Sequence, residues 1–349
     1  MNKNNLKNEI DKFYDSYQGA SDLRSDEEKA KDYLQTEFVG AINPIEWVEK
    51  DPNAGNEWRS FPILNQFFTS KCVAFTVAKL ALINFWLKTE TFLQFSPNSI
   101  YFYRINKPAE GMIGNDAFDI WQSKGISLEA ISRSNQIQEA DSVTVSNFAK
   151  EVAKGFVLGS HITIPSGDFD RVASTIQTTG KGIMCWFFFT SAEWSTLYPK
   201  IRENLADPYG SRASRHSVTA VDCGLIDGEE YIRIEDSAHF GGLSVRYISR
   251  SFFTARNFLV KYPMEFIYES GELPTFVFTK NMKFGDKNEE VRQLQQYLQK
   301  GGYYPSNLGF DGIYGNITKA SVVKFQLAHN LSPDGRVGPL TFAQLNLAV

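Results

Sequence analysis

The hydrophobic pattern along the chain changes character twice, and the first change lies near residue 45. Residues 1–45 are rich in charge and carry few apolar side chains, at Ile10, Phe13, Tyr14 and Tyr17. That spacing is typical of a short amphipathic helix packed against another surface. We therefore predict a helical N-terminal extension over 1–45, either peripheral or covering a cleft.

Residues 46–270 alternate helical and strand patterns. The segment CVAFTVAKLALINFWLKTE, which begins at Cys72, is apolar on nearly every face and predicts a buried helix. GIMCWFFFT (182–190) predicts a buried strand. HSVTAVDCGLIDGEEYIRIED predicts two antiparallel strands joined by a tight turn at Asp227-Gly228. Helices gather in the first half and strands in the second, which predicts an α+β domain.

A second change follows at residues 271–281, where glycine and proline predict a linker. The remaining residues, 282–349, begin with the helical pattern EEVRQLQQYLQKGGY. An approximate repeat follows, DGIYGNITKASVVKFQ (311–326) and DGRVGPLTFAQL (334–345). Each copy has Asp-Gly, a glycine three residues later, a threonine and then a helix, so we predict a small all-α domain of three helices.

Composition narrows the class of protein. The 349 residues are 42% hydrophobic and carry a net charge of −4, which favours two or three globular cores and excludes a typical nucleic-acid binder. Three cysteines do not make a disulfide framework. Scattered Cys and His residues without CxxC or HExxH spacing predict no metal site and no cofactor.

Targeting features are few. The N-terminal sequence has no apolar core typical of a signal peptide, and Val73–Leu87 is too short and polar to span a bilayer. We therefore expect a protein made in the cytoplasm and not inserted into a membrane.

Cys72 is the candidate nucleophile, because it opens the predicted buried helix. The positive end of a helix favours a thiolate, and a nearby imidazolium favours it further. Gln66, six residues upstream, could donate to an oxyanion beside the Cys72 backbone N–H. Cys185 and Cys223 lie in apolar strand patterns and are interpreted as structural thiols.

His216 is the candidate base. It begins the first strand of the predicted hairpin, and Asp236 follows the second strand. Antiparallel pairing would bring the two side chains together, so that Asp236 could orient the imidazole toward the sulfur of Cys72.

These residues also carry a resemblance. NQFFTSKCVAF, FSPNSIYFYRI, EGMIGNDAFDIWQSKGISLEA, HSVTAVDCG and YIRIEDS are similar to segments of the papain-like cysteine peptidases. The resemblance implies a two-lobed fold over 46–270, with a helical lobe and an antiparallel β lobe. It also implies that Cys72 is the nucleophile, His216 the base and acid, Asp236 the orienter and Gln66 the oxyanion donor.

The resemblance extends to the substrate cleft. By position it implies backbone contacts to substrate at Gly111 and at Met112, where a second glycine is usual. The usual orienter is Asn rather than Asp236, and the tryptophan that usually shields it is replaced by Ala238 and His239.

The C-terminal segment resembles the three-helix peptidoglycan-binding domains, on the motifs GGY, DGxYG, FQ and DGxVG. That resemblance implies binding of bacterial peptidoglycan, with Tyr314, Thr318 and Gln326 near the ligand or in the scaffold. Apolar core positions are expected at Leu294 and Phe325.

Together these features predict a cysteine endopeptidase held on the bacterial cell wall, cutting either peptidoglycan peptides or wall proteins. Without a visible signal peptide, such an enzyme would act after release by a holin or another route, as phage endolysins do. Two alternatives stay open: an inactive papain-like fold in a wall-binding or virion structural protein, and an intracellular protease with a repurposed module.

Overall fold

The computed structural model describes residues 42–50, 63–66, 69–90, 93–107, 111–129, 131–132, 134, 143–205, 208, 212–268 and 281–345. The predicted extension up to residue 41 and the predicted linker up to residue 280 lie outside these ranges. The chain divides into two compact units, Met1–Tyr268 and Glu269–Val349, and each is described by itself.

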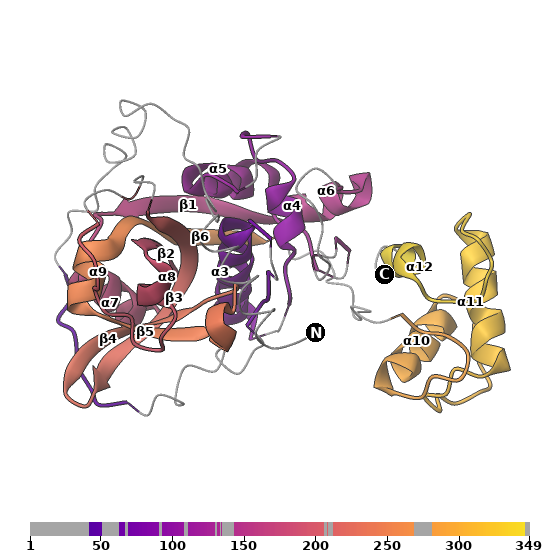
Figure 1. Cartoon of the computed structure of the whole chain (residues 1–349). Helices are drawn as coiled ribbons and strands as arrows, with labels where there is room; N and C mark the ends of the chain where they lie inside the picture. The colour runs from indigo at the N-terminus through magenta and orange to yellow at the C-terminus, as the bar shows by residue number, and fades with distance from the viewer. Residues whose placement is uncertain are drawn as a thin grey trace, which may run out of the picture. The chain divides into compact units, whose positions relative to one another are not determined.

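The helices described in the first unit are α3 (Cys72–Thr89), α4 (Pro97–Tyr101), α5 (Gly114–Lys124), α6 (Asn147–Lys154), α7 (Phe169–Thr179), α8 (Ser191–Trp194) and α9 (Arg250–Arg256). Every residue of α3 from Cys72 to Phe85 is buried, which confirms the predicted core helix. By length and composition α3 could cross a membrane, but 78% of it is buried inside this unit. It contacts α4, α5 and strand β3 (Ser214–Ile226), and Figure 1 shows it lying among these elements.

Six strands form one sheet: β1 (Phe156–Ile164), β2 (Ile183–Phe189), β3 (Ser214–Ile226), β4 (Glu229–Glu235), β5 (Val245–Ser249) and β6 (Asn257–Tyr268). Their order is β1-β6-β2-β3-β4-β5, and every neighbouring pair is antiparallel. All seven residues of β2 are buried, as its unbroken apolar run predicts.

The predicted hairpin between β3 and β4 is confirmed. Asp227 and Gly228 both have positive φ, 53° and 77°, which is the backbone that a tight two-residue hairpin turn requires. The turn fixes the pairing of β3 with β4, and so places the start of β3 beside the end of β4. The site described below is built at that end of the hairpin.

The second unit contains the three predicted helices, α10 (Glu289–Lys300), α11 (Asn316–Ala328) and α12 (Pro339–Leu345). Its buried core includes Leu294 and Phe325, which confirms both expected core positions, together with Val337 and Leu345.

The internal repeat of this unit is a repeat of hydrogen bonds. In the first copy the Gln295 amide donates to Asp311 (2.7 Å) and to Thr318 (3.0 Å), and its carbonyl accepts from the Gly312 N–H (3.0 Å). In the second copy Gln326 makes the same three bonds, to Asp334 (2.8 Å), Thr341 (3.0 Å) and Gly335 (2.9 Å). A buried glutamine thus closes each Asp-Gly turn onto the helix that follows it.

Candidate active site

Cys72 is the first residue of α3, and its side chain is fully buried. Lys71 precedes it with a non-helical backbone, φ −103° and ψ 15°, so the helix starts at the cysteine itself. The first N–H groups of a helix have no acceptor within the helix, and the aligned peptide dipoles favour negative charge there. The fold therefore gives the Cys72 sulfur the position that the sequence predicts.

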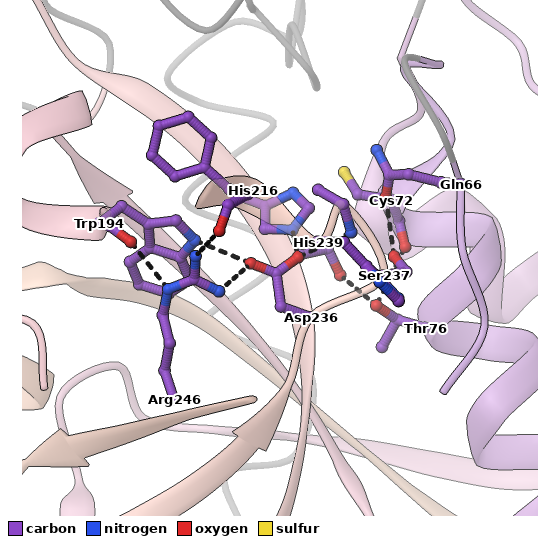
Figure 2. A network of polar contacts seen from close by, with 12 residues as sticks. Gln66, Cys72, Thr76, Trp194, His216, Asp236, Ser237, His239 and Arg246 are labelled. Carbon is purple, nitrogen blue, oxygen red and sulfur yellow. Dashed lines mark hydrogen bonds and ion pairs between the residues drawn. The ribbon is translucent and has the colours of Figure 1, made fainter. Parts of the chain in front are cut away.

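His216 lies on β3, opposite Phe187 of β2, and is also fully buried. Its Nε2 is 2.7 Å from Oδ1 of Asp236, which leaves Nδ1 as the ring nitrogen that can meet a thiol. Figure 2 shows His216 between Asp236 and Cys72.

The charge of His216 is set by its partners. Burial alone lowers the pKa of the imidazole, but the Asp236 carboxylate and the interaction with Cys72 outweigh it and raise the pKa to about 10. The structure therefore favours an imidazolium at neutral pH, which is the form that stabilises a thiolate.

Asp236 follows β4 and is held by donors on both oxygens. Oδ1 accepts from the Ala238 N–H at 2.8 Å as well as facing His216. Oδ2 accepts from Trp194 Nε1 at 2.9 Å and from the Arg246 guanidinium at 2.5 Å. Burial raises the pKa of this carboxyl, but His216, Arg246 and the hydrogen bonds outweigh burial and hold its pKa well below the ordinary value. Asp236 is therefore an anion with a fixed orientation.

The tryptophan that the resemblance leads one to expect after Asp236 is supplied from elsewhere. Trp194, at the end of α8, donates to Asp236 and stands edge-on to His216, with ring centroids 6.3 Å apart. It stacks on Phe189 at 4.2 Å, and a capping box between Thr190 and Glu193 fixes the short helix that presents it. Sequence reasoning missed this residue, although a tryptophan within a short helix that follows the buried strand β2 was a visible signal.

Gln66 is buried and fixed at both ends of its side chain. Its amide Nε2 donates to the Thr69 carbonyl at 2.7 Å, and its Oε1 accepts from the Ser237 hydroxyl at 2.7 Å. The backbone N–H of Gln66 also donates to the Ser237 carbonyl, at 2.8 Å. Gln66 is thus tied to the residue after Asp236, and its role as oxyanion donor stays a prediction.

A row of polar residues on α3 continues the site along the helix. Thr76, one turn after Cys72, accepts from the Ser217 hydroxyl at 3.0 Å. Lys79, a turn further, forms an ion pair with Glu235 at 2.8 Å, and both side chains are at least 96% buried. These pairs join α3 to β3 and β4, and their polar character within an apolar helix was the signal that could have found them.

The predicted substrate contacts at Gly111 and Met112 lie in a short segment before α5. The Gly111 N–H donates to the Tyr101 hydroxyl at 3.2 Å, and its carbonyl accepts from Asn106 at 3.3 Å. The side chain of Met112 is fully buried. A substrate contact here would therefore involve backbone alone, and it stays a prediction.

In the second unit, Tyr314, Thr318 and Gln326 are each at most 1% exposed. The Tyr314 hydroxyl donates to the Gly335 carbonyl at 3.1 Å, and the other two belong to the repeated turn networks. These side chains face the interior, and a role for them near a ligand stays a prediction.

The remaining thiols are unlike Cys72. Cys185 and Cys223 lie on β2 and β3, are buried, and form no disulfide. Burial raises the pKa of Cys185, which keeps it a thiol. Within the described ranges, no three His, Cys, Asp or Glu side chains come together as a group that could hold a metal ion.

Comparisons with known proteins identify each unit separately. Residues 287–345 match the family model of the putative peptidoglycan-binding domain. A stretch of 72 residues is 38% identical to a zinc D-Ala-D-Ala carboxypeptidase of Streptomyces albus G, and one of 63 residues is 44% identical to an N-acetylmuramoyl-L-alanine amidase of Bacillus licheniformis. These stretches cover 20% and 17% of this chain, and only 28% and 18% of the two relatives.

Solved structures identify the fold of the larger unit. Xylellain, a cysteine protease from Xylella fastidiosa, matches with a TM-score of 0.54 at 12% identity, over 70% of this chain and 94% of its own. Digestive procathepsin L 3 of Tenebrio molitor matches with a TM-score of 0.53 at 16% identity, over 75% of this chain and 79% of its own. The chain therefore combines an α+β, papain-like two-lobed fold with a small all-α peptidoglycan-binding domain at its C-terminal end.

Proposed function

We propose that the protein is a cysteine peptidase in which Cys72, His216 and Asp236 act as the catalytic triad. The observation that supports this most strongly is the order of the three side chains. Cys72 begins α3, the buried imidazole of His216 faces it, and Oδ1 of Asp236 lies 2.7 Å from Nε2 of that imidazole. A core helix needs neither a thiol at its first residue nor a charged histidine beside it. Peptide hydrolysis by a cysteine nucleophile uses both.

In the proposed reaction the Cys72 thiolate attacks the carbonyl carbon of the scissile peptide bond. The oxyanion is stabilised by the Cys72 backbone N–H and the Gln66 amide. His216 gives its proton to the leaving amine as the C–N bond breaks, and a thioester to Cys72 remains. A water molecule then loses a proton to His216 and attacks the thioester, which releases the acid and restores the thiolate–imidazolium pair.

We propose further that the C-terminal domain holds this enzyme on bacterial peptidoglycan. The family match of residues 287–345 supports this, and two of the similar proteins are named as a carboxypeptidase for D-Ala-D-Ala and an amidase for N-acetylmuramoyl-L-alanine. The substrate would be an internal peptide bond in the stem peptides or cross-bridges of the wall, or in a protein attached to it.

Purified sacculi test this function. Wild type should release new amino groups from the sacculi, Cys72→Ala should release none, and Cys185→Ala should match wild type because its thiol is a buried structural one. Mass spectrometry of the products identifies the bond cut. Equal release by wild type and Cys72→Ala would contradict the proposed triad.

A second candidate is a wall-binding or virion structural protein with an inactive papain-like fold. The observation that favours it is that Cys72 and His216 are both 0% exposed, whereas a working nucleophile must be reached by substrate. This candidate predicts sedimentation of the full chain with sacculi, and no release by any variant.

A further inference from the structure

Arg246 is a buried cation with no place in the mechanism described so far. It lies on β5, is fully buried, and directs its guanidinium at Asp236 Oδ2, 2.5 Å away. The same guanidinium donates to the carbonyls of Trp194 at 2.8 Å and Phe240 at 3.0 Å. Figure 2 shows Arg246 on the side of Asp236 away from Cys72.

The charges around His216 would not balance without Arg246. Asp236 is fully buried, and an unpaired carboxylate is costly to bury. Without Arg246, the negative charge of Asp236 would also repel the Cys72 thiolate, because both anions lie beside the same His216 imidazolium. Arg246 brings the charge of the Asp236–Arg246 pair to zero, and it occupies Oδ2 so that Oδ1 faces the imidazole.

We propose that Arg246 is a positioning residue, which neutralises Asp236 and fixes its carboxylate so that His216 and Cys72 can form an imidazolium–thiolate pair. This inference rests on the proposed role of Cys72 as nucleophile. It explains how this chain uses an acid as the orienter, because the buried pair presents an oriented oxygen to His216 without adding net charge.

Several charged or titratable groups described on the elements around His216 have contacts of their own. From α3, Lys79 is bound to Glu235, and from β4, Arg233 also contacts Glu235 at 3.5 Å. From the segment after β4, the imidazole of His239 lies 3.2 Å from the Leu64 carbonyl. Cys72 itself faces His216 from the start of α3. Among the described residues, Arg246 is thus the arginine or lysine that forms an ion pair with Asp236.

The pH dependence of Cys72 alkylation by iodoacetamide, followed by intact mass on the full chain, tests the proposal. Removing the Arg246 charge leaves Asp236 as a buried anion without its cation. This anion repels the Cys72 thiolate, and Asp236 itself is protonated more readily. The pH at which the alkylation rate increases should therefore be higher by about one unit or more in Arg246→Met than in wild type. Arg246→Lys, which keeps the charge, should move it less.

Arg256→Met is the matched control. Arg256 is also buried and forms an ion pair with Glu193 of α8 at 2.8 Å, one residue from Trp194. This variant should lower the melting temperature and move the alkylation profile less than Arg246→Met does, because Asp236 keeps its charged partner. The proposal is overturned if Arg246→Met and Arg256→Met give the same profile.

A double variant covers the case in which Arg246→Met folds poorly or the thiol is covered. Asp236→Asn leaves Arg246 as an unpaired cation beside His216, whereas Asp236→Asn with Arg246→Met removes both charges together. In ¹⁵N-histidine NMR spectra, with His216 assigned from a His216→Gln variant, the double variant should hold the His216 proton to a higher pH than Asp236→Asn. Identical titrations would overturn the proposal.

These readouts separate this inference from the proposed function. If Cys72 shows the expected charge coupling but the protein cuts no peptide, the inference stands and the peptidase proposal fails. If peptide is cut but Arg246→Met leaves the pH profile of alkylation unchanged, the peptidase proposal stands and the inference fails.

Discussion

At the scale of single residues, the site is a chain of charges inside a buried environment. In the proposed triad Asp236 holds a proton on His216, and the imidazolium in turn would stabilise negative charge on Cys72. Trp194 contacts both partners of this pair: its indole N–H donates a hydrogen bond to Asp236 Oδ2, and its ring packs edge-on against His216. Each member depends on the next, so the loss of one hydrogen bond should be measurable at the sulfur.

Trp194→Phe should slow alkylation of Cys72 by roughly tenfold, because hydrogen bonds to charged groups contribute about 1.5–3 kcal/mol. The phenyl ring can still stack on Phe189, so the fold should be kept. Trp186→Phe is the control, since the buried Trp186 Nε1 has no hydrogen-bond partner among the described residues. Equal slowing in both variants would show that loss of ring volume, rather than loss of the bond to Asp236, is responsible.

The raised pKa of His216 also predicts a pH dependence of stability, best measured in Cys72→Ala, where the proton of the thiol no longer enters the balance. The pKa of His216 is raised from 6.5 to about 10 in the folded protein, and Asp236 remains its partner in this variant. The folded state then holds a proton that the unfolded chain releases above about pH 6.5. The free energy of unfolding should therefore fall as pH rises above this value.

Denaturant titrations between pH 6 and pH 10 measure this slope. A Cys72→Ala/His216→Gln variant should lack it. A slope that persists in the double variant would assign it to another group.

The residues of this site differ in how far sequence can predict them. Cys72, His216 and Asp236 were identified because a helix start and a hairpin turn place them by local geometry. Trp194 and Arg246 were not, since they reach Asp236 from α8 and β5, 42 and 10 residues away in the chain. Their contacts depend on how the sheet folds back, which no local pattern encodes.

At the scale of elements, α3 joins the helical side of the fold to the sheet. Its apolar residues predicted burial correctly, but its polar residues have meaning only through β3 and β4. Thr76 pairs with Ser217 and Lys79 with Glu235, so the helix is held in register against the strand that carries His216. This register keeps the first residue of α3 opposite the imidazole.

Lys79→Met should destabilise the protein by up to about 3–5 kcal/mol, because the buried Glu235 would lose its 2.8 Å partner and keep only the 3.5 Å contact with Arg233. Lys79→Met with Glu235→Leu should recover much of that loss, since both charges then leave the interior together. Chemical denaturation of the full chain measures the free energy of unfolding in both variants. A double variant as unstable as Lys79→Met would contradict the account of this ion pair.

At the scale of the whole molecule, two units of different design occur in one chain. The papain-like unit contains a largely buried helix and a six-stranded sheet, whereas the peptidoglycan-binding unit repeats one glutamine-closed turn. The repeat was readable from Asp-Gly spacing. The inward direction of Thr318 and Gln326 was not, because the same motif serves a ligand site or a scaffold equally well until the hydrogen bonds are known.

The central claim is that Cys72 and His216 form an activated pair, and intact-mass analysis after treatment with an epoxide inhibitor of thiol proteases tests it most directly. The account predicts a single label on wild type and on Cys185→Ala, and none on Cys72→Ala or His216→Ala. Absence of label on folded wild type, or equal labelling of wild type and His216→Ala, would contradict it.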